Sequence, residues 1–526
     1  MSRIARAATL IAVLTVVSRV VGFGRTWVLT LSVGQTDLGS VYASANAIPN
    51  IIFEIVAGGA MAALVVPLLA GPVAAGDRAA VARTTSALLT WVLATLTPLA
   101  ILVAAGADWV IKIVAGQDWT AQQLSTGATM LRIFAIQIPL YGLGVVLIGV
   151  LQAHRKFAWP VIAPLLSSAV VIGAYALFAA HDGARVDLAH TTEVGILILS
   201  VGTTLGVVVL SGCLLIPLRS LRLRLRPHWQ VEHPQVRGLA ASGLLTVGFQ
   251  QLALIVALRL ANDVAADGTA LVFTVAQTVY LLPWAVLAVP TATAAYPALA
   301  EAAVTGELQA YNQTLARTAR AVTLLSCLGA ALLVGVAGPA AAFLSAGADP
   351  DALAWGIAAF APGLVGYGLA ALLSRALYAR GGQRQAAIAF GLGWGTAAIA
   401  MPVLSIVLPE SARVAALGLG TSIGMTVLGA VLVIQLRRAG ATMPGLARAA
   451  GAGLLAAILG AAAGNGVRWL AGGVPSGLGG IVALGAAAGL AVIGVFVAVV
   501  LPLDGGDLRA IARRRGRRTA AGTGEG

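Results

Sequence analysis

Two arginines lie inside an apolar stretch near the start of the chain, in the segment Ser-Arg-Val-Val-Gly-Phe-Gly-Arg that begins at Ser18. The apolar run extends from about residue 7 to residue 33, so a helical rise of ~1.5 Å per residue puts Arg19 ~18 Å and Arg25 ~27 Å from its start. An arginine near the middle of a membrane costs about 2.5 kcal/mol or more, so it normally faces a wet cavity and meets an anion. We therefore expect Arg19 and Arg25 to bind an anionic group. The alternatives are side chains that extend to the interface and ion pairs that only join helices.

One carboxyl group lies deep in the second apolar run, which extends from about residue 41 to residue 71. Glu54 would be buried ~20 Å from the end of this run near Val41. A buried carboxylate needs a partner or must take up a proton. Arg19 is the best-placed partner, because antiparallel neighbouring helices bring the two residues to overlapping depths. Two interpretations stay open here: a fixed ion pair between Glu54 and Arg19, and a proton- or ion-coupled switch that frees the arginine for its anion.

Uncharged polar residues accompany these charges. Asn46, Pro49 and Asn50 precede Glu54, and a proline within a span frees a backbone carbonyl that needs another partner. We expect these residues to line a cavity. The spans in the second half of the chain carry uncharged polar residues, at Gln251, Gln277 and Thr278. We therefore expect the cavity wall to be cationic where the first half forms it and only polar where the second half forms it.

Composition restricts the class of protein that holds such a cavity. Apolar residues make up 59% of the 526 positions and charged residues only 10%, which indicates a polytopic membrane protein. The apolar segments are long and continuous, so the predicted fold class is all-α rather than a barrel, and the 63 glycines suit close helix contacts. No nucleophile elbow, phosphate loop or pair of catalytic carboxylates occurs, so we expect a transporter rather than an enzyme.

We expect neither a cofactor nor a metal, since no nucleotide site occurs and the histidines form no ligand set. Energy for transport would then come from the membrane potential or a coupled ion. Cys213 and Cys327 lie far apart inside apolar runs, without metal-ligand spacing, and are expected as two buried thiols.

The formal net charge of +14 comes from basic residues in the loops between apolar segments. No basic domain with interleaved aromatic residues occurs, so nucleic acid is not an expected partner. The basic loops and tail are instead expected to contact anionic membrane lipids. Basic and acidic loops alternate along the chain, which by the positive-inside rule places both termini in the cytoplasm.

About fourteen segments are long enough to span a membrane, at ~20 residues each. They lie at about residues 7–33, 41–71, 84–106, 124–153, 158–180, 194–217, 237–262, 269–300, 312–337, 352–379, 386–408, 413–436, 446–471 and 478–502.

Short internal matches indicate a duplication. Pro67-Leu68-Leu69-Ala70 after the second span matches Pro297-Ala298-Leu299-Ala300 after the eighth, and Pro49 and Pro283 occupy comparable places. Offsets of about 230 residues predict two lobes of six helices each, as in alternating-access transporters. The predicted domains are a first lobe at residues 1–220, a second lobe at 221–440, two further helices at 441–503 and a basic cytoplasmic tail at 504–526.

Several of these segments resemble the MurJ (MviN) family of lipid II flippases, within the superfamily of multidrug, oligosaccharidyl-lipid and polysaccharide exporters. The resemblance is strongest from residue 8 to about residue 165. It rests on the segment from Ser18 to Arg25, Ile48-Pro49-Asn50, Gly59-Ala60, Val66-Pro67, Leu131-Arg132-Ile133, Gly149-Val150-Leu151-Gln152-Ala153, Phe157, Pro160 and Ala163-Pro164.

The resemblance implies a multi-pass protein of the bacterial inner membrane that moves lipid II, an undecaprenyl-linked glycan precursor of peptidoglycan, to the outer leaflet. It implies that Arg19 and Arg25 hold the substrate diphosphate. Asn50 and Ser18 are further expected substrate-binding residues. A planar guanidinium suits phosphate because it donates two hydrogen bonds at once. The last two helices would form a groove for the lipid tail, and proteins of cell-wall synthesis would be partners.

The chain also departs from the pattern of this family. Phe53 and Glu54 stand where arginines are usual, and Gln277 and Thr278 stand where an aspartate-arginine pair is usual. A divergent paralogue would fit these differences. The rival hypotheses are an ion-coupled exporter of another lipid-linked glycan or small amphipathic compound, and a scaffold that recruits partners through its basic tail.

Overall fold

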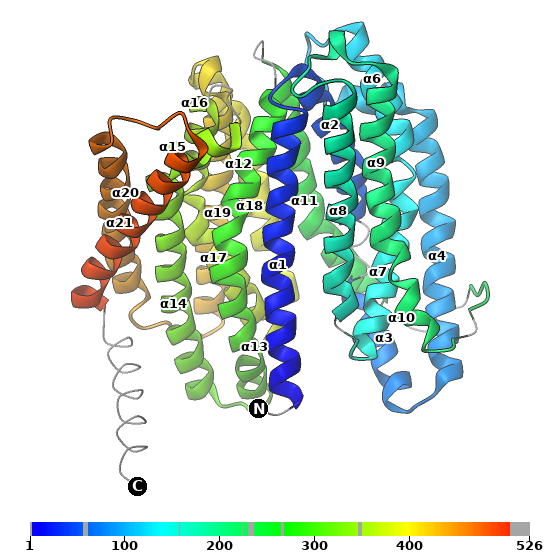
Figure 1. Cartoon of the computed structure of the whole chain (residues 1–526). Helices are drawn as coiled ribbons and strands as arrows, with labels where there is room; N and C mark the ends of the chain where they lie inside the picture. The colour runs from blue at the N-terminus through cyan, green and yellow to red at the C-terminus, as the bar shows by residue number, and fades with distance from the viewer. Residues whose placement is uncertain are drawn as a thin grey trace, which may run out of the picture. The chain divides into compact units, whose positions relative to one another are not determined.

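The computed structural model describes residues 3–55, 62–156, 158–223, 225–229, 236–264, 268–345 and 350–504. Within its helices, the side chains of residues 3–16, 19, 62–64, 66–67, 236–246 and 504 lie outside the description, and with them the predicted contacts of Arg19. All regular secondary structure in the described ranges is helical (Figure 1), which confirms the predicted all-α fold class.

Ten helices among the described residues are long and apolar enough to cross a membrane. A helix pair bent by 44°, α16 (Asp351–Phe360) and α17 (Gly363–Ala379), makes an eleventh if it is one span. The remaining predicted spans coincide with α1 (Arg3–Ser32), with α2 (Asp37–Phe53) and α3 (Ala62–Ala74), and with α11 (Val236–Asn262). In each of these cases part of the run lies outside the description, so the total of fourteen stays a prediction.

The chain divides into two compact units that do not follow chain order. Unit 1 comprises residues 1–278, 344–353 and 390–420, and unit 2 comprises residues 279–343, 354–389 and 421–526. The predicted boundaries of the two six-helix lobes stay a prediction, because these units follow packing rather than a repeat.

Unit 1 contains the helices of the first half of the chain. α1 packs on α8, α8 on α9, α2 on α6, and α4 and α3 on α7. Besides α1, α2, α3 and α11, its helices are α4 (Arg78–Ala105), α5 (Ala107–Val110), α6 (Ala121–Phe134), α7 (Gln137–Ala153), α8 (Ala158–His181), α9 (Glu193–Gly212), α10 (Leu215–Arg219) and α12 (Thr269–Pro283) up to Thr278, with 3₁₀ turns at Ile111–Ile113 and Leu188–His190.

Local sequence explains where these helices begin and break. The Thr36 hydroxyl accepts a hydrogen bond from the Gly39 amide at 3.2 Å and so caps α2, which then continues through Pro49. The predicted span at 124–153 is interrupted between α6 and α7. Pro139 lies in the first turn of α7, where its missing N–H would have no helical partner, so the second helix starts there at little cost.

Unit 2 is organised around a long central helix, α14 (Leu308–Gly335). It packs on α13, α17, α20 and α21, and the apolar side chains of Cys327, Val492 and Phe496 meet there. Unit 2 also holds, wholly or in part, the π-helix at Trp284–Ala288, α13 (Val289–Val304), α15 (Ala337–Ser345), α16, α17, α18 (Gln383–Val407), α19 (Arg413–Arg438), α20 (Leu446–Leu470) and α21 (Leu478–Asp504). The 3₁₀ turn at Glu410–Ala412 belongs to unit 1.

Small residues allow close helix approach in unit 2. A Cβ atom built on Gly366 of α17 would lie 2.1 Å from the Met425 carbonyl oxygen of α19, and one on Gly429 would lie 2.7 Å from the Gly366 Cα. Only glycine permits this crossing, as the glycine-rich composition predicts. Cys213 and Cys327 are both buried and free, which confirms the expectation of two buried thiols.

Candidate substrate-binding site

Arg25 is the one of the two predicted anion-binding arginines whose side chain the structure describes. It lies on α1, its side chain is exposed, and no ion pair with another described residue neutralises it. Its charge interacts electrostatically with three tyrosines of α2, α7 and α8, namely Tyr42, Tyr141 and Tyr175. Arg25 therefore supplies an unneutralised cation beside polar side chains, as an anion site requires.

Asn50 and Tyr141 form a second part of the site. The Asn50 Oδ1 accepts a hydrogen bond from the Tyr141 hydroxyl at 2.9 Å, and its Nδ2 donates to the Asn46 carbonyl at 2.7 Å. The Phe53 ring packs on Tyr141 with centroids 4.6 Å apart. Tyr141 thus links Asn50 to the neighbourhood of Arg25. The sequence analysis missed it, although a tyrosine inside an apolar span was a signal.

Two polar groups near the end of α2 have no described partner. The Asn46 Oδ1 is buried and accepts no hydrogen bond from any described residue. Glu54 caps the C-terminus of α2, and its amide donates to the Asn50 and Ile51 carbonyls. Its side chain is exposed rather than buried as predicted, and the carboxylate forms no ion pair within the described part of the chain. The predicted pair with Arg19 lies outside the described side chains.

A hydrogen-bonded cluster supports the tyrosines. The Tyr42 hydroxyl lies 2.7 Å from both the Tyr175 hydroxyl and Thr203 Oγ1, and the two rings meet edge to face. All three residues are buried, on α2, α8 and α9. Between α7 and α9, Gln137 Nε2 donates to Thr204 Oγ1 at 3.2 Å. These bonds fix the wall of unit 1, because a buried hydroxyl left unpaired would cost ~1–3 kcal/mol.

The other predicted cavity residues are not joined to this group by any hydrogen bond between described residues. Gln251 on α11 is buried and its Oε1 is unpaired. Gln277 is half-buried on α12, and the Thr278 hydroxyl donates to the Thr274 carbonyl one turn back at 2.9 Å. Ser18 is half-buried on α1, and Pro49 is buried inside α2.

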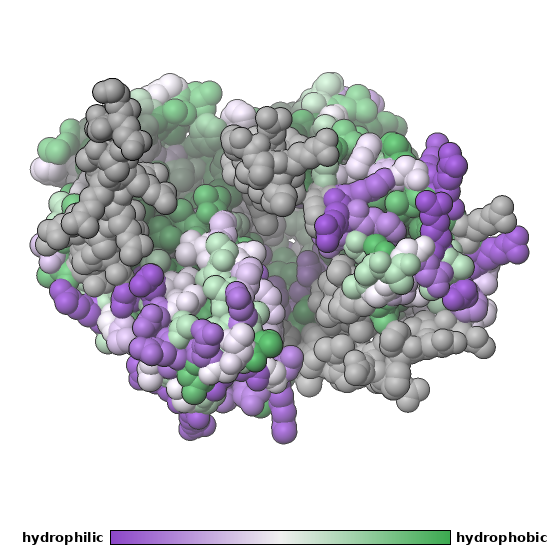
Figure 2. Space-filling model, turned by 90° about the horizontal axis from the view of Figure 1, so that it is seen from below, coloured by the Kyte–Doolittle hydropathy of each residue, from purple (hydrophilic) through white to green (hydrophobic). Residues whose placement is uncertain are grey.

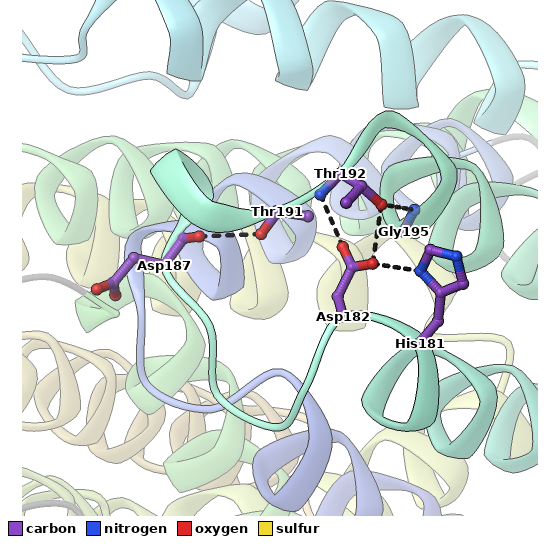
Figure 3. A network of polar contacts seen from close by, with 6 residues as sticks. All are labelled: His181, Asp182, Asp187, Thr191, Thr192 and Gly195. Atoms are coloured by element: carbon purple, nitrogen blue, oxygen red, sulfur yellow. Dashed lines mark hydrogen bonds and ion pairs between the residues drawn. The ribbon is translucent and has the colours of Figure 1, made fainter.

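Asp182 organises the loop between α8 and α9. Its side chain is buried and accepts hydrogen bonds from His181 Nδ1 and from the Thr192 amide and hydroxyl, the latter two at 2.8 Å (Figure 3). Burial alone would raise the pKa of the Asp182 carboxyl, but these hydrogen bonds outweigh it and hold the pKa below its ordinary value. Thr192 in turn accepts from the Gly195 amide at 3.0 Å and caps α9.

A family model described as lipid II flippase MurJ matches residues 31–474. The chain belongs to this family. A curated MurJ family member, the lipid II flippase MurJ of Burkholderia cenocepacia, is 29% identical over 388 residues, which cover 71% of this chain and 73% of that protein.

Solved structures agree in fold with the MurJ family assignment. An inward closed lipid II flippase MurJ matches with a TM-score of 0.73 at 16% identity, covering 94% of this chain and all of that one. An inward-facing multidrug resistance transporter of the MATE family matches with a TM-score of 0.65 at 15% identity, covering 81% of this chain and 95% of that chain. The second structure is a transporter of the MOP superfamily, the exporter superfamily that the resemblance of the sequence indicated.

Proposed function

We propose that this membrane protein is a lipid II flippase that carries the lipid-linked glycan from the inner to the outer leaflet by alternating access. The match of residues 31–474 to the lipid II flippase family carries this proposal. The unneutralised guanidinium of Arg25 beside Asn50 and Tyr141 supports it, because a diphosphate needs charge-assisted donors inside a membrane.

In this proposal Arg25 and Arg19 bind the diphosphate. Asn50, Tyr141 and Ser18 contact adjoining polar groups, and Asn46 offers an acceptor to a substrate hydroxyl or amide. The polyprenyl tail stays in lipid beside α20 and α21, where Leu454, Ile458 and Leu490 are more than half exposed. Both termini lie in the cytoplasm, and transport proceeds without covalent chemistry or a cofactor.

The test is depletion of this protein in its own bacterium, with labelling of lipid II in each leaflet of the membrane. We expect lipid II to accumulate in the inner leaflet and the wild-type chain to restore its distribution. An unchanged distribution after depletion would reject lipid II as the substrate.

Glu54 is the proposed site of proton or ion coupling, since its exposed carboxylate at the end of α2 has no ion-pair partner among the described residues. In vesicles with an imposed ion gradient, Glu54→Gln should transport at the same rate with and without the gradient, while the wild type responds to it. Asp108→Asn is a matched control, because Asp108 already pairs with Arg132 at 2.6 Å. A gradient response that Glu54→Gln retains would assign coupling to another group.

A further inference from the structure

A second basic site lies in unit 1, on residues that the transport proposal does not use. A pocket of about 600 Å³ is bounded by the N-terminal part of α4 and the segment that follows α10. Both elements lie at the lower end in Figure 1, and hydrophilic side chains gather on the face seen from that end (Figure 2). Four arginines line the pocket, Arg78 and Arg83 from α4 and Arg222 and Arg226 from the later segment.

The two walls are joined by specific hydrogen bonds. The Arg226 amide donates to Ser86 Oγ at 3.1 Å, and the His228 amide donates to Thr90 Oγ1 at 3.0 Å. At the next residue of α4, Trp91 Nε1 donates to the Trp229 carbonyl at 2.9 Å. Segments about 140 residues apart in the chain are thereby held in one geometry, and the pocket is a built feature of unit 1.

No carboxylate among the described residues balances the charges in this pocket. None of its four arginines forms an ion pair with a described residue. The neighbouring carboxylate of Asp77 accepts a hydrogen bond from the Ala80 amide at 2.8 Å and caps α4. Like charges that share a small pocket repel one another, so an anion bound there would remove that repulsion.

Arg222 adds an independent observation. Its backbone has a φ of 49°, a left-handed conformation in which glycine is the usual residue. A residue with a side chain strains the backbone in this conformation, and strained backbone positions are enriched at ligand sites.

The surroundings identify the kind of anion. Trp91 and Trp229 meet edge to face with centroids 5.6 Å apart, and both are exposed, Trp91 to 46% and Trp229 to 59%. Tryptophan is enriched at the interface between membrane and water, and α4 is one of the membrane-spanning helices. We propose that this pocket binds the phosphate of an anionic membrane phospholipid whose acyl chains lie against Trp91 and Trp229. By the positive-inside rule the lipid belongs to the cytoplasmic leaflet.

The first experiment separates ligand binding from folding. Arg222→Gly relieves the backbone strain, so the purified variant should unfold at the same or a higher temperature while its affinity for phosphatidylglycerol falls several-fold by native mass spectrometry. Arg155→Gly is the matched control, because Arg155 also has a positive φ, of 57°, but does not line the pocket. It should keep its lipid affinity. Equal affinities for both variants would overturn the proposal.

The second experiment tests the charge. Arg83→Gln with Arg226→Gln should weaken phosphatidylglycerol binding by about 30-fold, which corresponds to ~1 kcal/mol for each of two arginines. The control removes two exposed arginines outside the pocket, with Arg384→Gln and Arg438→Gln, and should change the affinity less than about threefold. An equal loss in both double variants would mean that only total charge matters, and would reject a defined site.

A third arm distinguishes a lipid from a soluble phosphate compound. The affinity for phosphatidylcholine should be the same for the wild type and for the pocket variants. Inorganic pyrophosphate at equal concentration should not displace phosphatidylglycerol. Displacement by pyrophosphate would overturn the lipid assignment. Lipid binding is measured without transport, so a negative binding result would not reject the proposed flippase function. A negative transport result would likewise not reject the proposed lipid site.

Discussion

The two units accommodate polar groups inside a membrane protein in different ways. In unit 1 the Tyr42 hydroxyl has two hydrogen-bonding neighbours, and a cation stands nearby at Arg25. In unit 2 the Tyr280 ring stacks on Phe360 and Tyr367 with centroids 5.0 and 6.2 Å apart, while its buried hydroxyl has no described partner. Tyr42 in unit 1 is therefore held by hydrogen bonds beside a charge, whereas Tyr280 in unit 2 is held by ring contacts. This contrast suits a binding function for unit 1.

The sharpest test of the contrast removes one cation from each unit. Arg25→Ala should lower lipid II transport by about 100-fold or more, because a charge-assisted contact to a diphosphate within the membrane is lost. Arg375→Ala in unit 2 should retain most of the transport, since Arg375 donates to the Ala371 carbonyl of its own helix. Leaflet labelling of lipid II in complemented cells measures both. Equal losses would show that unit 2 contributes a substrate cation as well.

The next test removes one hydroxyl from each aromatic group. Tyr42→Phe should destabilise the protein by about 2 kcal/mol, because it leaves Tyr175 and Thr203 short of a buried partner. Tyr280→Phe should be neutral or stabilising, since it removes an unpaired buried hydroxyl. Thermal unfolding of the two purified variants gives the comparison. A destabilised Tyr280→Phe would contradict the description of unit 2.

A smaller effect is expected at the link between Asn50 and Tyr141. Tyr141→Phe keeps the ring contact with Phe53 and removes only the 2.9 Å hydrogen bond to Asn50, so transport should fall about fivefold, which corresponds to ~1 kcal/mol. Tyr141→Ala should fall further because the ring is lost too. If Tyr141→Phe transports at the wild-type rate, the orientation of Asn50 does not depend on this bond.

The smallest effect concerns the loop of unit 1 that Asp182 holds. The pKa of Asp182 in the folded protein is lowered from an ordinary value of 3.8, so its contribution to stability is complete above that pH and is lost as the pH falls toward the folded pKa. Wild-type protein should therefore lose more thermal stability between pH 5 and pH 3 than Asp182→Asn, which has no carboxyl group to titrate there. An equal loss of thermal stability in the two proteins would exclude a stabilising role for the Asp182 carboxylate.

Much of the fold followed from the sequence, because a membrane imposes a one-dimensional rule. A run of about 20 apolar residues must be a helix when no water can satisfy its backbone. The same rule made Arg25 conspicuous, since a charge in an apolar run costs free energy wherever the helix packs. The segments from Ser18 to Arg25 and from Ile48 to Asn50 carried the family resemblance that the match over residues 31–474 then confirmed.

Only the tertiary structure decided which polar groups meet. Tyr141 joins Asn50, and Tyr42 joins Tyr175 and Thr203, across 91 to 161 residues of chain, and no local pattern encodes such pairs. The exposure of Glu54 and the inclusion of residues 390–420 in unit 1 likewise depend on packing. Hydropathy records the cost of burying each residue one at a time, whereas a binding site depends on distances between side chains, which the folded chain alone sets.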